Sequence, residues 1–153
     1  MIILKATTET LELTTSVAGS IDYYTSSSLV TSTTATPTSS FGNITTATTT
    51  TIGTSPWASE QKSFELITIE NKGTVTNTVT LKIDNSGTEY FLYSATLQPW
   101  ENLTYVKWNG FDKHSQGGDD TSMNVTDKRW PISATSFNLL KVWVACEGAG
   151  IMH

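Results

Sequence analysis

The feature that most restricts how this chain can fold is the near absence of charge from its first third. Between Glu12 and Glu60 the only charged side chain is Asp22, and threonine and serine supply most of the polar groups. Threonine is β-branched and favours extended backbone. No part of the chain shows a sustained apolar stripe at helical spacing with capping residues. We therefore expect an all-β protein with little helix.

Several segments alternate apolar and polar residues with a period of two, as half-buried strands do. These segments are 9–13, 63–70, 75–83, 89–97, 103–108 and 137–146. Turns rich in Gly, Asn and Asp separate the segments between 63 and 108, which predicts an antiparallel meander. Residues 9–13 and 21–24 suggest a further hairpin. Together the segments predict an antiparallel β-sandwich of jelly-roll or immunoglobulin-like type.

Residues 25–56 form a Thr/Ser-rich segment with few large apolar side chains, namely Leu29, Val30, Phe41, Ile44 and Ile52. Their burial cannot offset the entropy of ordering so much chain. The high charge typical of disordered segments is also missing. We therefore expect an extended arm that becomes ordered by adding a strand to another subunit or surface. The chain then divides into 1–56, which holds N-terminal strands and this arm, and 57–153, a sandwich body with a long loop at 109–131.

Composition argues against several classes of partner. The 153-residue chain has a net charge of −5 and only nine Lys and Arg residues. These are scattered, whereas binding to nucleic acid needs clustered cations to displace phosphate counterions. Cys146 is the only cysteine, so no intrachain disulfide is possible. The apolar start, Met1 to Leu4, is too short for a signal peptide or membrane span. We expect a protein made in the cytoplasm, with no nucleic-acid or membrane partner.

Catalytic and metal-binding patterns are weak. Cys146 could pair formally with His114 or His153, but its apolar surroundings are more typical of a buried structural cysteine. A cation could be imagined among the acidic residues Asp112, Asp119, Asp120 and Asp127. Their spacing matches no EF-hand, and a solvated acidic loop is the simpler interpretation. No pair of carboxylates is singled out for glycoside hydrolysis. We expect no enzymatic activity and no cofactor.

Tryptophans at strand ends and in loops are the remaining candidates for function. Such residues suit a protein contact or a sugar platform, because a large rigid ring contributes much contact area for little lost entropy. The alternative is that they cap the ends of the core. With the arm, they give the predicted partner-binding residues Ile44, Thr48, Thr50, Ile52, Trp57, Trp100, Trp108 and Trp130.

Three stretches resemble a group of small proteins encoded among the virion genes of tailed bacteriophages and prophages. They are TTETLELTTSVAGSIDYY, GNITTATTTTI and FELITIENKGTVTNTVTLKIDNSGTEYFLYSATLQPWENLTYV. The resemblance covers about residues 3–107. The chain differs by continuing through 109–153, where we would expect a member of this group to stop soon after the last of these strands.

The resemblance implies a virion structural protein made in the host cytoplasm. Our first hypothesis is a capsid cement, or decoration, protein on the capsid surface. Such a protein binds the major capsid protein, stabilises contacts between its subunits, and commonly forms a homotrimer at a local symmetry axis. The second is a tail or head-fibre module that binds host cell-surface glycan through the loop tryptophans. A glycan hydrolase is a distant third.

Overall fold

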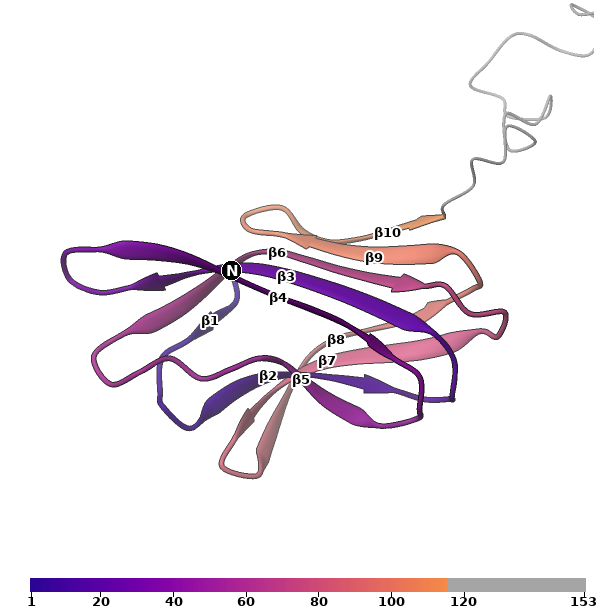
Figure 1. Ribbon diagram of the computed structural model, residues 1–153, viewed down its shortest axis with the longest axis horizontal. Coiled ribbons are helices and arrows are strands. Elements are labelled where there is room, and N and C mark those ends of the chain that lie inside the picture. The colour runs from indigo at the N-terminus through magenta and orange to yellow at the C-terminus, as the bar shows by residue number, and fades with distance from the viewer. Residues whose placement is uncertain (116–153) are drawn as a thin grey trace, which may run out of the picture. The chain divides into compact units, whose positions relative to one another are not determined.

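The computed structural model of the protein describes residues 1–115, which form a sandwich of two antiparallel sheets (Figure 1). Sheet A has six strands: β1 (Ile3–Leu4), β3 (Ile21–Val30), β4 (Ala35–Ile44), β6 (Gln61–Asn71), β9 (Glu101–Val106) and β10 (Gly110–Ser115). Sheet B has four: β2 (Glu9–Thr15), β5 (Thr49–Gly53), β7 (Asn77–Asn85) and β8 (Thr88–Leu97). The predicted antiparallel β-sandwich is confirmed. This part of the chain contains no helix that could cross a membrane.

The order of the strands is that of a rearranged jelly roll. Sheet A runs β10-β9-β6-β3-β4, with β1 also paired to β6, and sheet B runs β5-β2-β7-β8. If the strands are taken in the order β4, β5, β6, β7, β8, β9, β2 and β3, each has the same neighbours in its sheet as the corresponding strand of an eight-stranded jelly roll. The β3–β4 hairpin therefore joins strands that would be the last and the first of that fold. β1 and β10 are additions to it.

The predicted meander is wrong in its pairing. β6 pairs with β3 and β9, whereas β7 pairs with β2 and β8, so only the β7–β8 hairpin of the expected meander forms. The expected hairpin of 9–13 with 21–24 is also wrong, because β2 and β3 belong to different sheets. Alternation indicates which face of a strand is buried, but it does not say whether the next strand pairs beside it or crosses to the other sheet.

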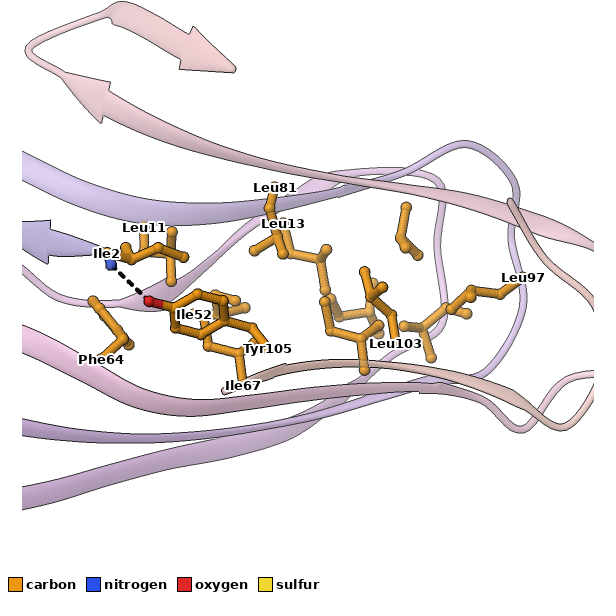
Figure 2. Close-up of a cluster of buried hydrophobic side chains, with 14 of the residues drawn as sticks. Ile2, Leu11, Leu13, Ile52, Phe64, Ile67, Leu81, Leu97, Leu103 and Tyr105 are labelled. Carbon is orange, nitrogen blue, oxygen red and sulfur yellow. Dashed lines mark hydrogen bonds between the residues drawn. The ribbon is translucent and has the colours of Figure 1, made fainter. Parts of the chain in front are cut away.

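The core is formed by the inward-facing side chains of both sheets (Figure 2). It contains Ile2, Leu4, Leu11, Leu13, Ile21, Ile44, Ile52, Phe64, Ile67, Ile69, Val79, Leu81, Leu97, Leu103 and Tyr105. The hydroxyl of Tyr105 accepts a hydrogen bond of 2.8 Å from the backbone N–H of Ile2, which ties the N-terminal segment to β9. At the side where β8 and β10 run, the ring of Tyr93 stacks on that of Phe111, with centroids 4.3 Å apart. Aromatic packing thus closes this side of the sandwich.

The expectation of an extended arm at 25–56 is corrected by the structure. These residues contribute most of β3 and all of β4 and β5, and they pair within the same chain with β6 and β2. The boundary expected at residue 56 is therefore not a boundary of the sandwich, since strands from both sides of it form both sheets. The segment has too few apolar groups to order itself, but the remainder of the chain supplies the missing sheet edges and core.

The loop expected at 109–131 is also partly corrected. Residues 110–115 form β10, which pairs along its whole length with β9. Polar side chains at Asp112, Lys113 and His114 hide this strand from a reading of hydrophobic alternation. The rest of the loop and the strand predicted at 137–146 lie outside the described residues.

Hydroxyl pairs cover the outer face of sheet B. The hydroxyls of Thr14 and Thr49 lie 2.8 Å apart, and those of Thr80 and Ser94 lie 2.9 Å apart. A further cross-strand pair joins Thr78 to Thr96 at 3.0 Å. Such pairs stabilise neighbouring strands by a few tenths of a kcal/mol, up to about 1 kcal/mol each. The threonines therefore form part of the sheet's surface bonding.

Candidate functional site: the β4 margin

The least protected edge of the sandwich is β4, which has no neighbour on its outer side among residues 1–115. None of its ten residues is charged. We use the term β4 margin for three adjoining features: the free edge of β4, the outer face around Tyr24 and Phe41, and a cleft between β4 and β5.

The free edge presents unpaired backbone groups over most of its length. Proline in a sheet is confined to positions where its missing N–H would face solvent, so Pro37 marks the outward direction. Backbone groups alternate along a strand, and those of Ser39, Phe41 and Asn43 therefore point the same way. Proteins usually blunt such edges with charge, proline or bulges. The edge strands β8 and β10 carry charged side chains, and the uncharged edge strand β5 has only 5 residues and an irregular register against β2. The longer β4 has none of these devices beyond Pro37.

The cleft between β4 and β5 lies on the side of the sandwich opposite the aromatic stack of Tyr93 and Phe111. Its volume is about 210 Å³, and hydroxyls line it where a sandwich normally has apolar groups. Ser27 and Thr38 share a hydrogen bond of 2.8 Å, and the hydroxyl of Thr25 donates to the backbone carbonyl of Ile52 over 3.3 Å. The Thr25–Ile52 bond therefore joins the two sheets here, whereas the Ser27–Thr38 bond lies within sheet A. Trp57, which is 75% exposed, also lines the cleft.

A buried cation lies in this cleft. Lys62 is 7% exposed, and its Nζ donates to the backbone carbonyl and to the hydroxyl of Thr54 over 2.7 and 2.8 Å. Burial lowers the pKa of Lys62, although nearby Glu60 opposes this effect. The ammonium group fixes the start of the β5–β6 loop, in which Trp57 lies.

The outer face beside the edge carries two aromatic rings. Tyr24 on β3 and Phe41 on β4 are directly opposite each other, and they are 41% and 76% exposed. In the next row along the sheet Asp22 lies opposite Asn43 on one side and opposite Glu70 of β6 on the other. An aromatic strip thus borders a polar row.

Hydrogen bonds fix the polar row in place. Lys72 Nζ lies 2.6 Å from Asp22 Oδ2, and Asn43 Nδ2 donates to Asp22 Oδ1 and, over 2.9 Å, to Ser20 Oγ. The contacts with Lys72 and then with Asn43 lower the pKa of Asp22, more than its partial burial raises it. Asp22 is therefore a fixed carboxylate at neutral pH.

The structure buries some of the predicted partner-binding residues and exposes others. Ile44 and Ile52 are buried in the core, so their assignment to a partner surface is wrong. They looked isolated because their apolar neighbours come from distant parts of the chain. Thr48 is exposed and Thr50 is partly buried. The backbone carbonyl of Thr48 accepts a 2.9 Å hydrogen bond from the N–H of Thr15, which gives this turn a structural role.

The exposed tryptophans do not form one platform. Trp57 lies in the β5–β6 loop at one end of the sandwich, whereas Trp100 lies in the β8–β9 turn at the other (Figure 1). Trp108 lies in the β9–β10 turn and is 79% exposed, with Lys107 Nζ 5.8 Å from its ring centroid. Trp100 and Trp108 both have a positive φ, 66° and 70°, which is uncommon for a bulky residue. Trp130 lies outside the described residues.

Of the predicted catalytic and metal-binding candidates, the structure describes only Asp112 and His114. His114 Nε2 lies 3.3 Å from Asp112 Oδ2, and both side chains are mostly exposed on β10. Residues 1–115 contain no cluster of three or more His, Cys, Asp or Glu side chains that could hold a metal ion. The remaining candidates, Asp119, Asp120, Asp127, Cys146 and His153, lie outside this part of the chain.

The sequence reading missed the outer-face aromatics and the cleft. The signal for Tyr24 was the pair of tyrosines in IDYY, since adjacent residues of a strand face opposite ways and one ring must point outward. The cleft had no such signal, because its hydroxyls come from β3, β4, β5 and the loop after β5.

Comparisons of the chain with protein-family models, with curated proteins and with solved structures found no match.

Proposed function

We propose that the chain is a bacteriophage capsid cement protein that attaches to the major capsid protein by strand addition at β4. The observation that carries this proposal is the uncharged edge of β4, which is unpaired within residues 1–115. Strand addition uses backbone hydrogen bonds for affinity and neighbouring side-chain pockets for specificity. The β4 margin offers both, since the cleft and the outer-face aromatics lie on either side of the edge.

The aromatic groups of the margin support a protein partner. Trp57 borders the cleft and Phe41 projects beside the free edge, and each leaves about three quarters of its surface exposed. Large rings of this kind dominate binding energy when a partner buries them. An added strand would place its own side chains against Phe41 on one face of sheet A and in the cleft on the other.

The resemblance to virion proteins supports the identity of the partner. One of its three stretches, GNITTATTTTI, begins in β4 and ends in β5, so it spans the two strands that border the cleft. A cement protein is added to a preformed shell in many copies, and we expect it to be located on the capsid surface as a trimer. The proposal does not involve an extended arm, because residues 25–53 are already paired within the chain.

Co-sedimentation with capsids tests the proposal. The partner is the capsid assembled from the major capsid protein of the same genome. Ser39→Pro removes an N–H from the free edge, and Ser39→Lys adds the charge that natural edges use against pairing. Ser39 is exposed, so both variants should keep the wild-type circular dichroism spectrum. We expect at least a tenfold loss of bound copies for each variant.

The matched control is Ser115→Lys, which adds the same charge at the opposite edge of sheet A, on β10. It should bind like the wild type. Equal binding by the Ser39 variants would show that β4 is not the attachment edge. Failure of the wild-type protein to bind capsids would overturn the cement function itself.

A second candidate function is a tail or head-fibre module that binds host glycan through loop tryptophans. The left-handed backbone of the exposed Trp100 and Trp108 favours it, because strain at such positions is often found at binding sites. Quenching of tryptophan fluorescence by host polysaccharide, lost in Trp108→Gly, would support this function. A count of hundreds of copies per virion would argue against it.

A further inference from the structure

The outer face of sheet A contains a shallow depression beside the aromatic strip. Its volume is about 420 Å³, and its lining includes Asp22, Tyr24, Phe41, Asn43, Thr68 and Glu70. Ligand pockets span roughly 300–1,000 Å³ and combine apolar walls with a few placed polar groups. The depression matches this description, since two rings form one part of it and a carboxylate–amide row forms another.

The polar row is built before any ligand arrives. Lys72 and Asn43 hold the two oxygens of Asp22, and Asn43 is itself held by Ser20. Glu70 is directly opposite Asp22 across the β3–β6 pair. Asp22 and Asn43 therefore keep their positions with little further cost in side-chain entropy when a ligand binds.

A protein strand does not fit this face as it fits the β4 edge. The backbone groups of β3 and β6 are already used in pairing with their neighbours on both sides. What remains available is side-chain chemistry: apolar ring surface next to carboxylate and amide groups. A pyranose ring has the matching character, because its C–H face is apolar and its rim of hydroxyls donates hydrogen bonds.

Charge restricts the kind of sugar. Asp22 and Glu70 carry two negative charges near the depression, and Lys72 carries one positive charge, which already pairs with Asp22. Uronic or sialic acids would meet net repulsion here. We propose that the depression between Tyr24, Phe41 and the Asp22 row binds a neutral oligosaccharide. One sugar ring packs on the aromatic strip, and its hydroxyls donate to Glu70 and to the side-chain oxygen of Asn43.

Isothermal titration calorimetry of the full chain tests the site. The probes are three neutral oligosaccharides, namely cellohexaose, chitohexaose and maltohexaose, and one acidic oligosaccharide, a hyaluronan hexasaccharide. We expect at least one neutral probe to bind, and the acidic one to bind at least tenfold more weakly. Phe41→Ala and Tyr24→Ala should each weaken the binding at least tenfold.

The matched control is Phe91→Ala, which removes an equally exposed ring from β8 of sheet B. It should bind the neutral probe like the wild type. Equal weakening by this variant, or tighter binding of the hyaluronan probe, would overturn the proposal. Circular dichroism of each variant confirms that the fold is retained.

The outcome is separable from capsid attachment. Glu70 lines the depression but lies on β6, two strands away from the free edge, so Glu70→Gln should weaken saccharide binding and attach to capsids like the wild type. If no neutral probe binds, the saccharide proposal is wrong, and loss of capsid attachment by Glu70→Gln would then identify the depression as a contact for the capsid subunit. Saccharide binding by Ser39→Pro at the wild-type level would show that the two sites are independent.

Discussion

A methyl group added at Gly53 should destabilise the sandwich next to the cleft. A Cβ at this position would lie 2.4 Å from Cζ of Phe64 and 3.0 Å from Cβ of Leu11. Phe64 is fully buried and packs in the core, so its ring can move away only by displacing core neighbours or by turning into the cleft that it borders. Overpacking of this kind costs about 1–3 kcal/mol. Replacing a glycine within a strand by alanine is itself favourable by about 0.5–1 kcal/mol, which offsets part of this cost. We expect Gly53→Ala to lower the free energy of unfolding by about 1–2 kcal/mol.

Urea unfolding followed by tryptophan fluorescence measures this change. The midpoint should fall without a change in the slope, because the surface exposed on unfolding is the same. Thermal unfolding should show a melting temperature lower by roughly 2–8 °C for a chain of this size. Gly42→Ala is the matched control, since the new Cβ would meet the ring of Tyr23 at 3.0 Å. That ring is only partly buried and can rotate, so the expected loss is below about 1 kcal/mol.

A double variant tests the cause of the loss. Phe64→Leu removes the ring atoms that the new methyl group would meet. Combined with Gly53→Ala, it should cost at least about 1 kcal/mol less than the sum of the two single changes. Strict additivity, or a Gly53→Ala protein as stable as the wild type, would refute the packing argument.

Three further predictions concern polar side chains. Asn71→Leu removes a fully buried amide that donates to two backbone carbonyls, and it should cost about 2–4 kcal/mol in urea unfolding; a loss below about 1 kcal/mol would contradict the assigned bonds. Burial lowers the pKa of Lys62 below its ordinary 10.5, so the unfolded chain binds the proton more tightly than the folded chain. The free energy of unfolding should therefore rise with pH between the folded pKa and 10.5. Lys62→Met should lose this rise, and an unchanged pH profile would contradict it. Lys72 and Asn43 lower the pKa of Asp22 below its ordinary 3.8. The Asp22 carboxylate therefore stabilises the fold above pH 3.8, and this stabilisation disappears as the pH falls through the pKa of Asp22 in the folded chain. Because both side chains are partly exposed, Asp22→Asn should differ from the wild type by less than about 1 kcal/mol at pH 6 and by progressively less as the pH falls below 3.8, which comparison of the urea midpoints measures.

Local patterns in the sequence predicted strands better than they predicted partners. The alternation in 63–70 and 89–97 marks β6 and β8 within a few residues, because side-chain direction depends only on the strand itself. Pairing depends on residues far away, and so the meander was wrong. Ile44 and Ile52 show the same limit, since they appear as lone apolar residues among threonines until β3 and β6 surround them.

The candidate site was foreseen only in part. Trp57 was identified because a tryptophan in a loop has few structural roles, and the structure leaves it exposed beside the cleft. The free edge of β4 was not foreseen, because an edge exists only once the neighbours of every strand are known. The absence of charge from 25–56 was the sign of this edge in the sequence. It was interpreted as an arm because no local pattern shows that the partner strands lie in the same chain.

The hydroxyl pairs on the outer face of sheet B have a consequence for the medium in which the protein can work. Salt screens charges beyond about 8–10 Å at physiological strength and about 3 Å at molar strength, so a surface held together by ion pairs loosens as salt rises. The Thr14–Thr49, Thr80–Ser94 and Thr78–Thr96 contacts carry no net charge and offer nothing to screen. These three contacts should therefore persist from dilute fresh water to concentrated brine, whereas the Lys82–Glu12 and Lys82–Glu89 ion pairs on the same face should weaken.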